Sequence, residues 1–162
     1  MNLFGAPGTG KSTLAAALFA DLKCNGFNCE LVTEFAKDMT WAQRHHEMRV
    51  QPYIFGKQLA RIERVMNKVD IIITDSPLLL SLIYTTDEWP TSYSFSVLDI
   101  FRMYKNVNIL LKRVKKYNPA GRNQTEEESD EIYKQIMEML SVTDTPYTFI
   151  NSFQDDLNWM VK

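Results

Sequence analysis

The sequence predicts an α/β fold in which five parallel strands form one sheet with helices on both faces. Three observations predict it. Short apolar runs alternate with stretches of helical periodicity along the chain. The run from Asp70 to Asp75 is almost continuously apolar, as in a strand buried on both faces of a parallel sheet. A glycine-rich segment, Gly5 to Ser12, lies between the first expected strand and the first expected helix.

Length and composition indicate one globular domain over residues 1–162. The chain is 45% hydrophobic and 23% charged, which is ordinary for a protein with a single core. A formal net charge of -2 argues against general nucleic-acid affinity. No apolar run approaches the ~20 residues that span a bilayer, and no signal-peptide pattern is present. We therefore expect a cytoplasmic protein with no membrane partner, in which Cys24 and Cys29 are reduced core thiols.

The first two strands flank a well-marked helix. Leu3 and Phe4 end the first strand. Residues Lys11 to Lys23 carry an apolar stripe at helical spacing, and Asn25-Gly26 closes that helix. A second strand is expected from Cys29 to Thr33.

The middle of the chain is expected to be helical on both sides of the third strand. Residues Thr40 to Val69 have helical character, and Pro52 should divide them into two helices that meet near Gln51. The apolar strand that ends at Asp75 follows. A short helix is expected from Leu78 to Tyr84, and then a loop over residues 86–94 that contains Trp89, Pro90 and Tyr93.

The last part of the chain repeats the alternation. We expect a helix over residues 95–104, a strand over 107–111, a helix over 125–140, a strand over 147–150 and a closing helix over 153–161. The helix at 125 is the best marked, because Thr125 and Glu128 have the spacing of a capping box.

The glycine-rich segment matches G-x-x-x-x-G-K-[ST] in full. Its glycines permit tight backbone angles, so that successive amide hydrogens can converge on phosphate oxygens at the start of a helix. The motif predicts that Lys11 reaches the β- and γ-phosphates of ATP and that the Ser12 hydroxyl binds Mg²⁺. The alternative is a glycine-rich turn with a chance lysine. The expected nucleotide-binding residues are Gly5, Ala6, Pro7, Gly8, Thr9, Gly10, Lys11, Ser12 and Thr13.

Asp75 ends the apolar third strand at the edge where the phosphates would lie. This position predicts a magnesium ligand, and the alternative is an aspartate that caps the turn before Pro77. Ser76 follows it, where mechanical ATPases of the AAA and helicase type usually carry a glutamate that activates water. The absence of that base favours a kinase.

On these motifs the chain resembles the P-loop kinases of nucleosides and nucleotides. It is similar to the nicotinamide riboside kinase branch and to phage-encoded ATP-binding proteins of the AAA type. The resemblance implies a nucleotide kinase-like fold with a small lid, and transfer of the γ-phosphoryl group of Mg-ATP to a hydroxyl or phosphate of a small nucleoside-like or nucleotide-like acceptor. The segments that carry it are Gly5 to Thr13, Thr33 to Asp38, Thr74 to Pro77, and Arg113 with Gly121 to Gln124.

The resemblance also implies catalytic roles. Glu34 matches the acid that often acts as base on the acceptor hydroxyl, and Asp75 is a second candidate for the base. The alternative for Glu34 is a solvated acid at the end of a strand. Residues 113–124 match a mobile lid whose cations, Arg113 and Arg122, neutralise the transferring phosphoryl group. The alternative is that this basic run is solvated surface.

The acceptor site is expected to lie between residues 40–66 and 86–95. Candidate contacts to a base or sugar are Arg44, Gln51, Tyr53, Phe55, Gln58 and Arg61. Two other functions stay open. One is a kinase of a modified base in DNA, such as 5-hydroxymethyluracil, with a basic channel near Lys57, Arg61, Arg64 and residues 112–116. The other is an ATP-binding switch module without an acceptor.

Overall fold

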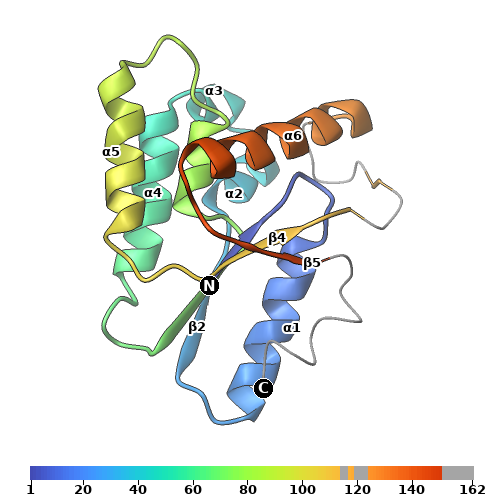
Figure 1. The fold of residues 1–162 in the computed structure, drawn as a ribbon, viewed down its shortest axis with the longest axis vertical. Coiled ribbons are helices and arrows are strands. Elements are labelled where there is room, and N and C mark those ends of the chain that lie inside the picture. Colours follow the sequence, from blue (N-terminus) through green and yellow to red (C-terminus); the bar gives the residue numbers. More distant parts are fainter. Residues whose placement is uncertain (114–116, 119–123, 151–162) are drawn as a thin grey trace.

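The computed structural model describes residues 1–113, 117–118 and 124–150, which form one parallel sheet with its helices (Figure 1). The strand order is β2-β3-β1-β4-β5, and each neighbouring pair is parallel. The predicted α/β class and the five parallel strands are confirmed. The strands are β1 (Asn2–Phe4), β2 (Cys29–Val32), β3 (Ile71–Thr74), β4 (Asn108–Leu111) and β5 (Thr148–Ile150).

The sheet carries a separate hydrophobic cluster on each face, because successive side chains of a strand point to opposite sides. Leu3 and Ile109 face α1 (Lys11–Cys24), which covers one side of the sheet. Phe4 and Leu110 face the opposite side. That side is covered by the helices α4 (Gln51–Glu63), α5 (Thr91–Arg102) and α6 (Glu126–Val142) (Figure 1).

The helical region after β2 begins earlier than predicted and is divided twice. Helix α2 (Phe35–Trp41) starts directly after β2, whereas helical structure was expected only from Thr40. Gln43 has a left-handed φ of 55° and separates α2 from α3 (His45–Met48). The predicted break near Gln51 is confirmed, since Pro52 lies in the first turn of α4, where its missing N–H has no helical partner to lose.

The loop predicted over residues 86–94 is shorter in the structure. Pro90 is extended, with φ -63° and ψ 146°, and acts as the N-cap of α5, so the prediction of loop for residues 91–94 is wrong. Tyr93 is drawn into the first turn of the helix, where its hydroxyl hydrogen-bonds with Ser81 at 3.0 Å. The short helix expected after β3 is the 3₁₀ helix η1 (Leu78–Leu82).

Helix α6 matches its prediction closely. The Thr125 hydroxyl accepts from the backbone N–H of Glu128, and the Glu128 carboxylate accepts from the Thr125 N–H at 2.7 Å, which completes the capping box.

Of the two cysteines, Cys29 is buried but Cys24 is exposed, so only one is a core thiol. The expected closing helix over 153–161 lies outside the described residues. Among the helices of the described part, none combines the length and apolar character that crossing a bilayer requires.

Candidate functional site

The glycine-rich loop connects β1 to α1 at the carboxyl edge of the sheet. Gly5 has a φ of 151°, and a Cβ there would lie 2.7 Å from the Thr9 hydroxyl oxygen and 2.9 Å from the Leu111 carbonyl oxygen. A larger residue would therefore push the loop away from β4. Gly10, also left-handed, is the N-cap of α1, which places Lys11 and Ser12 in the first helical turn.

The loop is held in shape by its own polar side chains. The Lys11 ammonium donates to the carbonyl oxygens of Gly5 at 2.7 Å and Ala6 at 3.1 Å. The buried Thr9 hydroxyl also donates to the Ala6 carbonyl, at 2.9 Å. Lys11 thus lies across the concave side of the loop, where a phosphate group would meet both the ammonium and the helix N-terminus.

One cavity of about 710 Å³ joins the loop to the ends of β2 and β3. Ala6 and Thr9 are buried in the body of the loop and do not line this cavity. Most of the residues predicted for the site do line it, namely Gly5, Pro7, Gly8, Gly10, Lys11, Ser12, Thr13, Glu34 and Asp75. The fold therefore brings together the phosphate loop and both predicted acids.

Asp75 has a deeply buried carboxylate that lines the cavity. Its side chain follows β3 and is 3% exposed. Its Oδ1 atom is buried and has no hydrogen-bond partner among the described residues. A buried carboxylate oxygen without a partner is costly unless a cation or a donor meets it. Together with the Ser12 hydroxyl in the same cavity, Asp75 offers the hard oxygen ligands that Mg²⁺ prefers.

Glu34 lies close enough to Lys11 and Asp75 for the charges of both residues to change its pKa. It is the N-cap residue of α2, but its carboxylate makes no cap hydrogen bond and lines the cavity. Burial raises the pKa of Glu34. The Asp75 charge raises that pKa as well, whereas the charges of Lys11 and Lys37 lower it. A carboxyl group whose proton is held more tightly than usual is suited to accept a proton from a substrate.

The cavity extends beyond the phosphate loop into a chamber between α2, α3, α4 and η1. Gln51, Phe55 and Gln58, which were predicted for the acceptor region, line it. Other lining residues lie within the predicted acceptor ranges 40–66 and 86–95 but were not named individually, among them Thr40, Met48, Arg49, Thr86 and Glu88. Sequence reasoning assigned no acceptor role to Lys37, Leu80, Ser81 and Tyr84, which lie outside those ranges and reach the chamber only through the tertiary fold.

The remaining predicted acceptor contacts are not among the residues that line the cavity. Arg44 forms an ion pair with Glu47. Arg61 pairs with Asp38 and also donates to the Thr33 carbonyl at 3.1 Å. The Tyr53 ring packs edge-on against Phe35, with ring centroids 5.8 Å apart.

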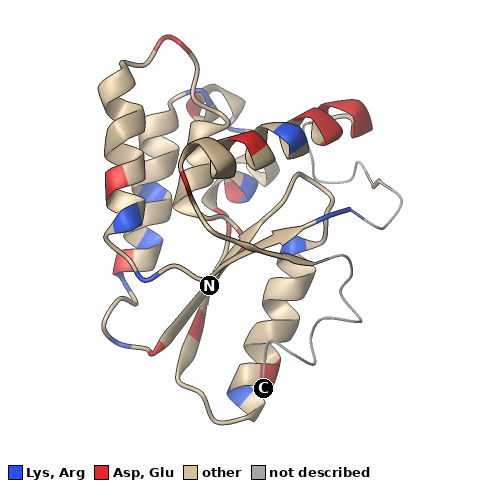
Figure 2. Cartoon of the chain, in the orientation of Figure 1, with Lys and Arg blue, Asp and Glu red and all other residues tan. Residues whose placement is uncertain are grey.

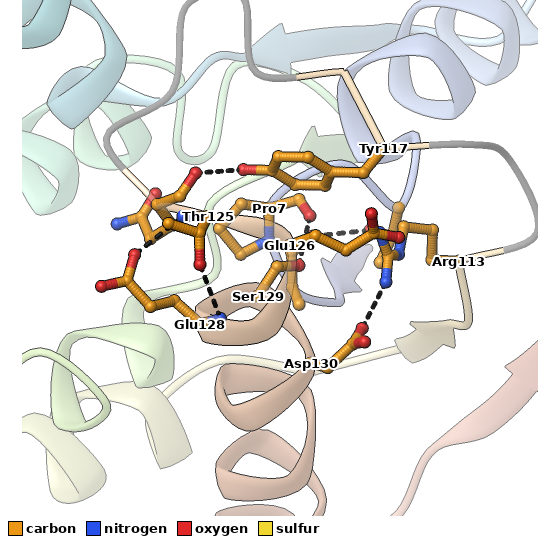
Figure 3. A network of polar contacts seen from close by, with 11 residues as sticks. Pro7, Arg113, Tyr117, Thr125, Glu126, Glu128, Ser129 and Asp130 are labelled. Atoms are coloured by element: carbon orange, nitrogen blue, oxygen red, sulfur yellow. Dashed lines mark hydrogen bonds and ion pairs between the residues drawn. The ribbon is translucent and has the colours of Figure 1, made fainter.

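Of the two arginines predicted for the lid, the structure describes only Arg113, which is paired with carboxylates outside the cavity. Arg113 follows β4, and its guanidinium pairs with Glu126 at 2.7 Å and with Asp130, both on α6 (Figure 3). Its side chain is 13% exposed and does not line the cavity. The acidic start of α6 lies beside this basic end of β4 (Figure 2). Arg122 lies outside the described residues, so its role as a lid cation stays a prediction.

Two solved structures share this fold. A deoxyadenosine kinase from M. mycoides with bound dATP is 18% identical, with a TM-score of 0.52, and the match covers 99% of this chain and 94% of that chain. The same enzyme with the products dCMP and dCDP is 16% identical, with a TM-score of 0.57, and the match covers 99% and 93%. At this identity the likeness shows a P-loop α/β fold of the nucleoside kinase type.

At the level of sequence, no curated protein matches the chain. A family model described as an AAA domain matches residues 1–155. That range includes the phosphate loop, all five strands and the cavity with Glu34 and Asp75. Since the match covers nearly the whole length, this chain belongs to the AAA-domain family of P-loop proteins.

Proposed function

We propose that the chain is a phosphotransferase that moves the γ-phosphoryl group of Mg-ATP to a small nucleoside-like or nucleotide-like acceptor. The observation that carries this proposal is that one cavity is lined by the phosphate loop and extends into a second chamber, and that Glu34 lines it within reach of the charges of Lys11 and Asp75. A hydrolase needs space only for the nucleotide and a water molecule. A kinase also needs room for an acceptor beside the transferred group.

ATP and magnesium fit the loop side of the cavity. Lys11 and the amide groups at the start of α1 would bind the phosphates. Ser12 and the carboxylate of Asp75, whose Oδ1 atom has no hydrogen-bond partner among the described residues, would hold the ion. Bound Mg²⁺ would neutralise negative charge on the phosphate oxygens. The similar M. mycoides structures contain dATP, dCMP and dCDP, which supports nucleotides as the ligand class.

Glu34 is our candidate for the base, with Asp75 as the alternative. In the transfer step an acceptor oxygen forms a bond to the γ-phosphorus, the bond from that phosphorus to the β–γ bridging oxygen breaks, and ADP leaves. The acceptor proton passes to the carboxylate. The pKa of Glu34, raised by burial, favours proton acceptance, whereas the Asp75 oxygen is better placed as a cation ligand.

Residues 113–124 complete the proposed enzyme as a lid, and the acceptor region comprises parts of residues 40–66 and 86–95. Closure over the reacting groups would exclude water, which would otherwise accept the phosphoryl group. In the structure, Arg113 pairs with carboxylates of α6. A catalytic role for Arg113 therefore requires it to exchange those partners for the nucleotide.

A transfer screen with γ-labelled ATP tests the proposal. Nucleosides, nucleotides and DNA that contains 5-hydroxymethyluracil serve as acceptors, with Lys11→Ala and Glu34→Gln as variants. We expect label in a small nucleoside-type product, no transfer by Lys11→Ala, and a lower kcat with nearly unchanged ATP affinity for Glu34→Gln. Label in DNA alone would establish the modified-base kinase instead. Slow release of phosphate with every acceptor would establish a switch module.

A further inference from the structure

A buried serine of α6 contacts the phosphate loop from the far end of the chain. The Ser129 hydroxyl donates to the carbonyl oxygen of Pro7 at 2.7 Å (Figure 3). Ser129 is 1% exposed, so the donor side of this partly buried hydrogen bond is removed from water. The two residues are 122 positions apart, and only the tertiary structure brings them together.

The other two carbonyl groups of this part of the loop are held from within the loop. Lys11 donates to the carbonyls of Gly5 and Ala6, and Thr9 donates to that of Ala6. If Lys11 turns to bind phosphate, its hydrogen bonds to the loop are given up. The bond from Ser129 does not depend on Lys11 and can persist when a nucleotide is bound.

The Pro7 carbonyl sets the direction of the next amide group. The Pro7–Gly8 peptide bond is trans, so the Pro7 C=O and the Gly8 N–H point in opposite directions. When the carbonyl is fixed toward α6, the Gly8 N–H points away from α6. Gly8 has a left-handed φ of 86° and lines the cavity, where this N–H can meet a phosphate oxygen.

The start of α6 is itself anchored, which makes Ser129 a rigid support. The capping box between Thr125 and Glu128 fixes the first turn. Arg113 at the end of β4 pairs with Glu126 and Asp130 on either side of Ser129 in the sequence (Figure 3). The serine hydroxyl is therefore held in place by the cap and by these ion pairs.

We propose that Ser129 is a positioning residue for phosphate binding, acting through the Pro7–Gly8 peptide. It rests on the proposed use of the loop for ATP but requires no particular acceptor. Without the hydroxyl, the peptide can rotate and the Gly8 N–H loses its fixed direction. Because one hydrogen bond to a charged phosphate is at stake, ATP affinity should fall about tenfold.

Calorimetric titration of the full chain tests this directly, with Mg-ATP and inorganic tripolyphosphate as probes. Ser129→Ala should raise both dissociation constants about tenfold and by the same factor, since the lost contact concerns phosphate alone. Ser129→Cys, which keeps the size and a weak donor, should lie between alanine and wild type. The matched control is Ser141→Ala, an exposed serine of the same helix, which should bind both probes as wild type does.

The outcomes separate this inference from the proposed function. Affinities of a folded Ser129→Ala protein within twofold of wild type would overturn the positioning role, and so would a Ser129→Cys protein that binds both probes as tightly as wild type. A loss for Mg-ATP but not for tripolyphosphate would also overturn it, because the serine would then act on the nucleoside part. If the predicted losses occur while no acceptor is phosphorylated, the positioning role stands and the kinase proposal fails. If wild type binds neither probe, both fail.

Discussion

Two carboxylates share one cavity with Lys11, but their surroundings suit them to different tasks. Glu34 is half-buried, and its pKa is raised by burial and by the charge of Asp75. Asp75 is more deeply buried and has an oxygen without a partner among the described residues. Pairs of acids in unequal environments commonly divide the work of proton transfer and charge stabilisation. At the scale of single residues, the ionisation of Glu34 is therefore the property to measure.

Lys37→Met should shift the pH dependence of kcat toward higher pH. A base works only when ionised, so activity should rise with pH through the pKa of Glu34, above the value of about 4.3 for an ordinary glutamate. The positive charge of Lys37 lowers that pKa, and its removal should raise it. The measurement is the midpoint of the acidic limb in a profile of kcat against pH.

Lys57→Met is the matched control for this prediction. Lys57 is also an exposed lysine of the same region, but its charge is not among those that act on Glu34. Its profile should overlay that of wild type. An acidic limb that stays in place when Lys37 is replaced would show that Glu34 is not the titrating base.

At the scale of elements, the site depends on how α4 joins the ends of β2 and β3. The Gln58 amide oxygen accepts from the backbone N–H of Phe35 at 2.9 Å. Its amide nitrogen donates at 3.4 Å to the Thr33 carbonyl and at 3.4 Å to the Thr74 hydroxyl. Gln58 was predicted to contact the acceptor. In the structure its side-chain hydrogen bonds connect the residues on both sides of Glu34 to Thr74 of β3.

Gln58→Ala should destabilise the protein by about 1–3 kcal/mol, because it leaves the buried N–H of Phe35 without an acceptor. It should also lower kcat, since the start of α2 that carries Glu34 loses a support. Urea unfolding and transfer kinetics measure the two effects. Lys57→Ala, one residue away and exposed, should change neither. An increase in acceptor KM with normal stability would instead mean that Gln58 contacts the ligand.

At the scale of the whole molecule, the parallel sheet collects its functional groups at one edge. The phosphate loop follows β1, Glu34 lies beyond the end of β2, and Asp75 follows β3. The two hydrophobic clusters on the faces of the sheet hold these strand ends in register. A ligand that binds across the edge contacts several strands at once, so binding should stabilise the entire fold.

Asp75→Asn should make the ligand-free protein more stable and the liganded protein less so. The substitution removes the charge of a buried carboxylate whose Oδ1 atom has no partner in the described part of the chain, which should raise the free energy of unfolding by about 1 kcal/mol. In wild type, Mg-ATP at 100 times its Kd should add about 2.7 kcal/mol. The variant should lose most of the part of that gain that depends on magnesium.

Thermal and urea unfolding with ATP, with Mg-ATP and without ligand would measure these differences. Asp99→Asn, which changes an exposed aspartate of α5, is the matched control and should behave as wild type. If Asp75→Asn destabilises the free protein and leaves the magnesium effect intact, the carboxylate has a structural role and is not a metal ligand.

The succession of strands and helices along the chain and the position of the phosphate loop could be predicted from the sequence alone. Both depend on local signals: apolar runs of strand length, the capping box at Thr125, and a motif in which every residue lies within a few positions of the next. The same locality explains why the break at Pro52 was correct. The positions of Glu34 and Asp75 could also be predicted, because the residues that follow parallel strands lie at the same edge of the sheet.

The tertiary structure alone decided the contacts between segments that are far apart in the chain. At the start of helix α2, the backbone N–H of Phe35 donates to the side chain of Gln58 on another helix. Arg113 pairs with the acidic start of α6, and Ser129 supports the loop at Pro7. Such partners leave no periodic pattern in the sequence. Their hydrogen bonds and ion pairs depend on distances and directions that exist only after the sheet and its covering helices have packed.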